Sequence, residues 1–112
     1  TASTATATAI TVYRPRDRSL TSVIISSGIT GTGANIRQAT PEAVGPVVAS
    51  LREISPGSGI WAVRATLNDT QIAALNAGNM YYEILSNAFP NGELRGQIVR
   101  TSGATATPWA AQ

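Results

Sequence analysis

Residues 80–100 have the pattern of two β-strands joined by a tight turn. The two candidate strands are residues 80–86 and 93–100, and the sequence Pro-Asn-Gly stands between them at 90–92. Proline fixes its own φ and glycine permits a positive φ, so this run favours a reversal of the chain. The pattern predicts a β-hairpin, which commits this part of the chain to an antiparallel sheet.

The first residues predict a second hairpin. Residues 1–9 alternate threonine or serine with alanine and run into Ile-Thr-Val-Tyr at 10–13. Strict alternation is typical of a strand with one small apolar face and one hydroxyl face. Pro15 and Asp17 mark a turn at 14–19, after which residues 20–25 form the return strand.

The other strand-like segments are short and are separated by loops or turns with glycine or proline. We expect loops at 28–33 and 38–45, a turn at 56–59, and strands at 34–37, 46–51 and 60–65. Several short strands at such spacing predict an all-β fold, a Greek-key-like antiparallel β-sandwich. The length of 112 residues fits a single domain over 1–112, with Thr/Ala-rich, strand-prone extensions at 1–12 and 101–112.

One short helix is predicted over residues 68–77. Asn68 or Asp69 can cap its start, Ile72 and Leu75 share one helical face, and Gly78 can end it. Residues 68–70 also match the acceptor pattern for N-glycosylation at Asn68. We favour the helix cap, which needs no sugar.

The composition argues against catalysis and cofactors. The chain has no cysteine and no histidine, so it lacks thiolate chemistry, the usual general acid–base group and imidazole ligands for zinc or copper. A glycosidase needs two carboxylates about 5–9 Å apart. Only Glu83 and Glu93 lie on segments that can approach each other. We therefore expect a protein that is not an enzyme and binds no cofactor.

The surface composition points to a location outside the cell. Only 12% of the residues are charged, and threonine, serine and alanine are abundant. No apolar run approaches the ~20 residues that span a bilayer, so we expect no membrane insertion. The first residues resemble a mature end left after removal of a signal peptide. We expect a secreted or cell-surface protein.

Several motifs together resemble the CHRD (chordin) domain family. They are Gly-Ala-Asn-Ile-Arg at 33–37, Gly-Pro-Val-Val-Ala-Ser-Leu at 45–51, Leu-Asn-Ala-Gly at 75–78 and Pro-Asn-Gly-Glu-Leu-Arg-Gly-Gln-Ile at 90–98. The resemblance covers about residues 4–100. It implies an extracellular, mostly antiparallel β-sandwich, related in shape to the copper–zinc superoxide dismutase sandwich. The family occurs in secreted developmental regulators and in microbial surface proteins.

The chain departs from the family at three histidine positions. The resemblance implies a metal cluster there, but Asn35, Arg37 and Leu85 occupy these positions. Strand alternation puts Asn35 and Arg37 on one face, and puts Leu85 on a face with Glu83 and Tyr81. A guanidinium, an amide and a leucine cannot form a transition-metal site. We therefore expect a divergent member of the family without metal.

Glu93, Arg95 and Gln97 alternate along the last predicted strand and so share one face. They could form a polar binding face. We favour a structural network in which Arg95 bridges Glu93 or the facing Glu83, and Gln97 satisfies backbone groups.

Arg14, Arg16 and Arg18 cluster at the first predicted turn, around Asp17. They could contact a polyanion such as a sulfated or acidic glycan. Three arginines are few for nucleic acid, which usually draws on several phosphate contacts, so we expect no nucleic-acid partner. A solvated turn is the favoured interpretation.

The terminal segments suggest self-association. Exposed edge strands are normally protected by charge, proline or bulges, and residues 1–12 carry none of these. We expect this segment to add to a neighbour's sheet and to build a filament or surface layer. The candidate residues are Thr4, Thr6, Thr8, Ile10, Val12 and Trp109. Deleting residues 1–9 should then abolish assembly and leave a folded monomer.

An alternative is a monomeric extracellular module that binds a protein or an anionic glycan through Arg14, Arg16 and Arg18. Sizing at low and high salt distinguishes the two hypotheses. Strand pairing should resist salt, whereas a polyanion contact should weaken steeply.

Overall fold

The computed structural model describes residues 5–40, 43–90, 92–98, 105–108 and 110–111, the last two ranges by their backbone. The elements are β1 (Thr6–Arg14), β2 (Ser19–Ser27), β3 (Gly31–Gln38), β4 (Val47–Glu53), β5 (Ile60–Thr66), α1 (Asp69–Asn76), β6 (Met80–Ser86), β7 (Leu94–Gln97), β8 (Thr105–Pro108) and β9 (Ala110–Ala111). Each predicted strand contains or overlaps an observed one, and the single predicted helix is confirmed.

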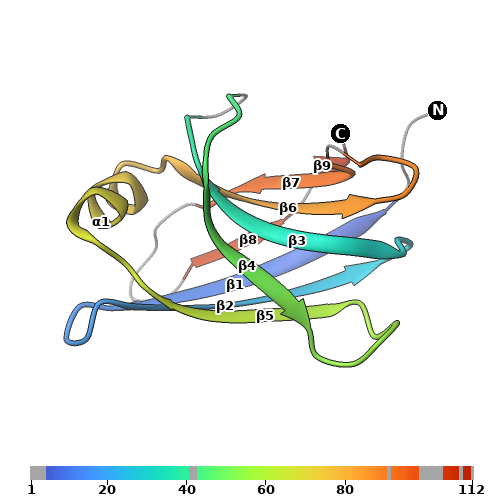
Figure 1. Cartoon of the computed structure of the whole chain (residues 1–112), viewed down its shortest axis with the longest axis horizontal. Helices are drawn as coiled ribbons and strands as arrows, with labels where there is room; N and C mark the ends of the chain where they lie inside the picture. Colours follow the sequence, from blue (N-terminus) through green and yellow to red (C-terminus); the bar gives the residue numbers. More distant parts are fainter. Residues whose placement is uncertain (1–4, 41–42, 91, 99–104, 109, 112) are drawn as a thin grey trace.

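The strands form one nearly closed antiparallel sheet in the order β8-β1-β2-β5-β4-β3-β6-β7-β9. β3, β4 and β5 follow one another, β6 returns beside β3, and β2 lies beside β5. These are Greek-key connections, so the predicted all-β Greek-key class is confirmed. In Figure 1, β4 crosses from the layer of β3 and β6 to the layer of β2 and β5, so it joins the two layers of the predicted sandwich.

β1 follows the alternation in its sequence. Its alanines face inward, with Ala9 0% exposed, while Thr6 and Thr8 are exposed. β1 pairs with β2 along its length and with β8 on its other side. Over Thr8–Thr11 it is therefore an inner strand, and the prediction of an unprotected edge is wrong for these residues. The local sequence does not reveal that residues 105–108 pair with Thr8–Thr11 on the second side of the strand.

β3 begins earlier than predicted. Residues 28–33 were expected as a loop, but Gly31 already belongs to the strand. A Cβ atom at Gly31 would lie 2.7 Å from Trp61 Cζ2, closer than packed atoms come. The glycine therefore serves the packing of the Trp61 ring against the strand, and not a turn.

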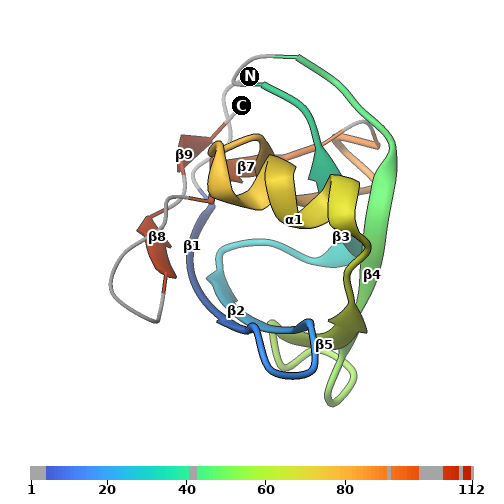
Figure 2. The same cartoon turned by 90° about the vertical axis from the view of Figure 1, so that its left-hand side faces the viewer.

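The helix has the predicted ends. Asn68 Oδ1 accepts a hydrogen bond from Gln71 N at 2.8 Å, and Gln71 Oε1 accepts one from Asn68 N at 2.9 Å, which completes a capping box. Gly78, with φ of 79°, follows the last turn. Figure 2 shows α1 lying across one end of the sheet, where Ala74 and Leu75 are buried.

The core lies between the two layers. Its most buried large side chains include Leu20, Ile24, Ile36, Tyr82 and Ile84. The Tyr82 hydroxyl lies 3.4 Å from Ser22 Oγ, which lies 3.1 Å from Thr11 Oγ1. Burial raises the pKa of Tyr82 well above its usual range, and the Ser22 contact opposes this only in part.

Candidate functional site

The outer face of β3, β6 and β7 carries a grid of polar side chains, called the polar face below. Across the three strands, one row runs through Asn35, Glu83 and Arg95, and the next through Arg37, Tyr81 and Gln97. The rows follow from strand register because residues two apart share a face. The polar face thus unites Asn35 and Arg37, where the resemblance implies histidines, with the predicted Glu83, Arg95 and Gln97.

Glu83 is the centre of this face and is only 5% exposed. Its Oε2 accepts hydrogen bonds from Asn35 Nδ2 at 3.0 Å and from Arg37 Nε. Arg37 also donates from NH1 to the Gly45 carbonyl at 2.8 Å. The carboxylate raises the pKa of Arg37 because it stabilises the charged guanidinium. The buried charge of Glu83 is therefore paired and hydrogen-bonded.

Arg95 makes a different contact from the one the sequence predicted. It lies opposite Glu83 in the β6–β7 register, but the ion pair of Glu83 is with Arg37. The Cζ atom of Arg95 lies 3.6 Å from the centroid of the Tyr81 ring, and its NH2 donates to the Thr40 carbonyl at 3.3 Å. The predicted bridge from Arg95 to Glu83 or Glu93 is absent from the ion pairs of the described residues. A guanidinium can stack on an aromatic face, and here the ring is the diagonal neighbour.

Gln97 binds backbone carbonyls of two loops, and Glu93 binds a side chain at the end of β6. Gln97 Nε2 donates to the Ala39 carbonyl at 3.1 Å and to the Gly78 carbonyl at 2.7 Å. Glu93 is buried one residue before β7 and accepts a hydrogen bond from Ser86 Oγ at 2.6 Å. Glu93 is thus anchored at the end of β6, apart from the pair formed by Arg37 and Glu83.

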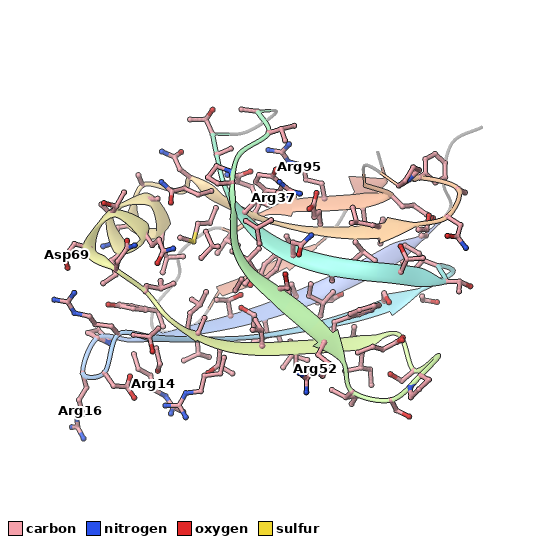
Figure 3. All side chains as sticks on the ribbon, viewed as in Figure 1. Arg14, Arg16, Arg37, Arg52, Asp69 and Arg95 are labelled. Carbon is pink, nitrogen blue, oxygen red and sulfur yellow. The ribbon has the colours of Figure 1, made fainter. Side chains whose placement is uncertain are left out.

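A hollow of about 370 Å³ opens on the polar face. Its lining combines charged or polar side chains with apolar ones, and comprises Arg37, Val44, Tyr81, Glu83, Leu85, Pro90 and Arg95. Figure 3 shows Arg37 and Arg95 above β3 and β6. Sequence reasoning missed Val44 and Pro90, which come from loops whose positions depend on the completed fold.

The residues at the three family histidine positions do not fit a metal ion. Arg37 brings a positive charge, and Leu85 brings no donor atom. Asn35 Oδ1 already accepts from Ser50 Oγ at 2.9 Å, and Glu83 Oε2 is bound by Asn35 and Arg37. Within the described part of the chain, no three His, Cys, Asp or Glu side chains are grouped for a metal.

The arginines of the first turn do not converge on one point. Arg18, with a positive φ of 59°, pairs with Asp69 at 2.6 Å, and Arg64 pairs with Asp17 at 3.2 Å. Hydrogen bonds from Ser19, with a smaller contribution from Arg64, lower the pKa of Asp17. Arg14 and Arg16 are exposed and have no hydrogen bond or ion pair to a described residue; Figure 3 shows them at one end of the molecule.

Residues 105–111 supply a second candidate site, the seam between β1 and β7. β8 pairs with β1 in the register Ile10 to Ala106, and β9 pairs with β7 in the register Leu94 to Ala111. Six antiparallel steps separate β1 from β7 around the sheet, so these two strands run in the same direction. β8 is antiparallel to β1 and β9 is antiparallel to β7, so β8 and β9 share one direction as well. Of the predicted self-association residues, Thr4 and Trp109 lie outside the described residues, and Thr6, Thr8, Ile10 and Val12 lie on the outward face of β1.

Comparison with known proteins places most of the chain in one family. A family model described as the CHRD domain matches residues 1–98. Neither a search of curated proteins nor a search of solved structures gives a match. The matched region ends with Ile98, so β1 to β7 fall within it, and β8 and β9 follow it.

Proposed function

Because the chain belongs to the CHRD domain family, we propose that it is a non-enzymatic extracellular module whose copies join by exchanging the segment 105–111. CHRD domains occur in secreted proteins. Among the described residues, no helix is long and apolar enough to cross a membrane. Glu83 and Glu93, the two carboxylates considered as a catalytic pair, are each engaged by neighbouring side chains. This supports a module that works by association.

The observation that carries the proposal is the place of the segment 105–111 in the sheet. It forms both outer strands, and it follows the region that matches the family. Without β8 and β9, the family-matched part would leave β1 and β7 as the two edges of the sheet, and strands antiparallel to them can pair with these edges. Unpaired strand edges are strong templates for another chain. The seam is therefore an acceptor, and the segment is its donor.

The donor segment suits exchange between copies. It contains no charged residue, and six residues, 99–104, separate it from the family-matched part. Transfer to a neighbour replaces the backbone pairing within a chain by the same pairing between chains. A head-to-tail exchange whose rotation does not close into a ring can continue into a filament or layer. β1 therefore accepts a strand in this proposal, whereas the sequence had suggested that it donates one.

A cysteine pair tests which chain supplies β8. The natural chain has no cysteine, so Ile10→Cys with Ala106→Cys introduces one pair at register partners on β1 and β8. Partners in an antiparallel pair lie about 4.5–5.5 Å apart at Cα, within the range of a disulfide. Exchange predicts a ladder of covalent multimers on a non-reducing gel after mild oxidation.

The controls fix the interpretation of that gel. Each single substitution should give at most dimers, and Ile25→Cys with Ala106→Cys should give no ladder because Ile25 lies on β2 and is not a register partner. If every disulfide of the Ile10/Ala106 pair forms within one chain at all protein concentrations, strand exchange is wrong.

A monomeric binding module is the second candidate, supported by the exposed Arg14 and Arg16. It would hold a protein or an anionic glycan. Retention on a sulfated polysaccharide column that disappears at high salt, and in Arg14→Gln with Arg16→Gln, supports this function. Multimers that persist at high salt support strand exchange.

A further inference from the structure

We propose that the hollow on the polar face binds a small monocarboxylate that carries an apolar or aromatic group. The lining includes Arg37 and Leu85, two positions at which the resemblance implies histidines, but its chemistry is that of an anion site. The inference is independent of strand exchange, which concerns the seam between β1 and β7.

The charge of the lining favours one negative charge on the ligand. The described lining contains two guanidinium groups, of Arg37 and Arg95, and one carboxylate, of Glu83. One positive charge is therefore not compensated within the lining. A ligand with two negative charges would be repelled by Glu83, whereas a monocarboxylate balances the site.

Both guanidinium groups retain donors for a ligand. Arg37 uses Nε toward Glu83 and NH1 toward Gly45, and Arg95 uses NH2 toward Thr40. A guanidinium has five N–H donors, so NH2 of Arg37 and Nε and NH1 of Arg95 have no hydrogen-bond partner among the described residues. Guanidinium donors match the two oxygens of a carboxylate in a bidentate arrangement.

The arginine side chains are held in place before any ligand arrives. Arg95 stacks on Tyr81, which is itself 1% exposed, and Arg37 is fixed between Glu83 and Gly45. Groups that are already ordered lose less conformational entropy on binding. The site therefore needs little rearrangement of its charged groups.

The rest of the lining defines the other half of the ligand. Leu85, Val44 and Pro90 offer hydrocarbon surface beside the arginines. Leu85 is half-buried, and Val44 is 81% exposed. An apolar group next to the carboxylate buries this surface, which favours binding in proportion to the area removed from water.

Equilibrium dialysis of the full chain with benzoate tests the proposal and does not depend on the state of assembly. Acetate and inorganic phosphate at the same ionic strength are the comparison probes. We expect one saturable benzoate site per chain, with acetate weaker because it lacks the ring and phosphate weaker because of its charge. The absence of saturable benzoate binding, or phosphate binding as tight as benzoate, overturns the proposal.

Variants locate the site. Arg95→Gln should weaken the affinity for benzoate by about tenfold or more, since a charge-assisted hydrogen bond changes an affinity by roughly 10- to 100-fold. The affinity of Arg95→Lys for benzoate should lie between those of the natural chain and Arg95→Gln, because lysine keeps the charge but loses the bidentate guanidinium geometry. Arg52→Gln is the matched control: Arg52 is exposed on β4, outside the lining, and its removal should leave binding unchanged.

A second variant guards against misfolding of the first. Leu85→Ser removes hydrocarbon surface at a half-buried position and should bring the affinities for benzoate and acetate close together. Equal benzoate binding by Arg95→Gln and the natural chain, or an unchanged preference for benzoate in Leu85→Ser, shows that the hollow is not the site.

Discussion

Arg95 stacks on Tyr81 at a distance of 3.6 Å between its Cζ atom and the ring centroid. Tyr81 is the diagonal neighbour of Arg95 across the β6–β7 ladder, while the directly opposite residue is Glu83. Glu83 is held from the other side by Arg37. Arg95 thus contacts Tyr81 and Arg37 contacts Glu83, and these contacts hold both guanidinium groups in the lining of one hollow.

A double-mutant cycle measures the Arg95–Tyr81 contact. We expect Arg95→Gln and Tyr81→Leu to show a coupling of about 0.5–2 kcal/mol in the free energy of unfolding, the range for a cation over an aromatic face. Urea denaturation of the natural chain, both single variants and the double variant gives this value. Arg52→Gln with Tyr81→Leu is the control cycle and should show no coupling; equal values in the two cycles would mean that the contact contributes nothing.

The Arg37–Glu83 pair gives a prediction with a rescue. Arg37→Gln leaves the buried carboxylate of Glu83 without its cation and should lower the free energy of unfolding by about 1–3 kcal/mol. Adding Glu83→Gln removes the unpaired charge and should restore part of this loss. The measurement is urea denaturation at neutral pH. An equal cost of Arg37→Gln with and without Glu83 would contradict the pairing.

Gly31 and Gly33 form a matched pair in β3. A Cβ atom at Gly31 would lie 2.7 Å from Trp61 Cζ2, whereas one at Gly33 would lie 3.9 Å from Leu85 Cδ1. We expect Gly31→Ala to destabilise by about 1–3 kcal/mol through overpacking, and Gly33→Ala to be neutral or slightly stabilising. Thermal or urea unfolding decides this, and similar effects at both positions would argue against the Trp61 contact.

Local sequence patterns were enough to predict most elements of the fold. The helix ends were predictable because Asn68 and Gly78 act through neighbouring backbone. The alternation in residues 1–9 predicted a strand with an alanine face and a hydroxyl face, and in the described part of β1 the alanine face is the buried one. Gly31 was misread as part of a loop because the reason for the glycine is the distant Trp61 ring.

The candidate sites depend on pairing between distant strands, which limits what the sequence could predict. Alternation placed Asn35 with Arg37, and Arg95 with Gln97, on common faces. Which carboxylate each arginine meets depends on the register of β3, β6 and β7, so the Arg95 partner was predicted wrongly. The seam was missed because β1 and residues 105–111 are far apart in sequence.

The burial of Tyr82 leads us to expect a loss of stability in alkaline solution. Burial raises its pKa in the folded chain above the unfolded value of about 10. Above that pH the unfolded chain has released the proton and the folded chain retains it. The free energy of unfolding should therefore fall as pH rises above about 10. Tyr82→Phe should reduce this fall in urea titrations from pH 8 to 11, with Tyr13→Phe as the control; an unchanged pH dependence in Tyr82→Phe would exclude Tyr82 as its source.

Two truncations at opposite ends should behave differently. Deleting residues 1–9 removes Ala5, Ala7 and Ala9 from the core, as well as four of the nine register pairs between β1 and β2. We therefore expect this variant to lack a cooperative unfolding transition by circular dichroism, contrary to the folded monomer that the sequence suggested.

Truncation after Ile98 keeps β1 to β7 and the whole described core, so this variant should fold with reduced stability and an open seam. A synthetic peptide of residues 99–112 should then bind it. The same peptide with Thr105→Pro and Ala106→Pro is the control, because adjacent residues in a strand point their N–H groups to opposite sides and one of the two must face β1. A shortened chain without residues 1–9 that melts like the natural protein, or equal binding of the two peptides, would contradict the role given to β1 as the acceptor of this segment.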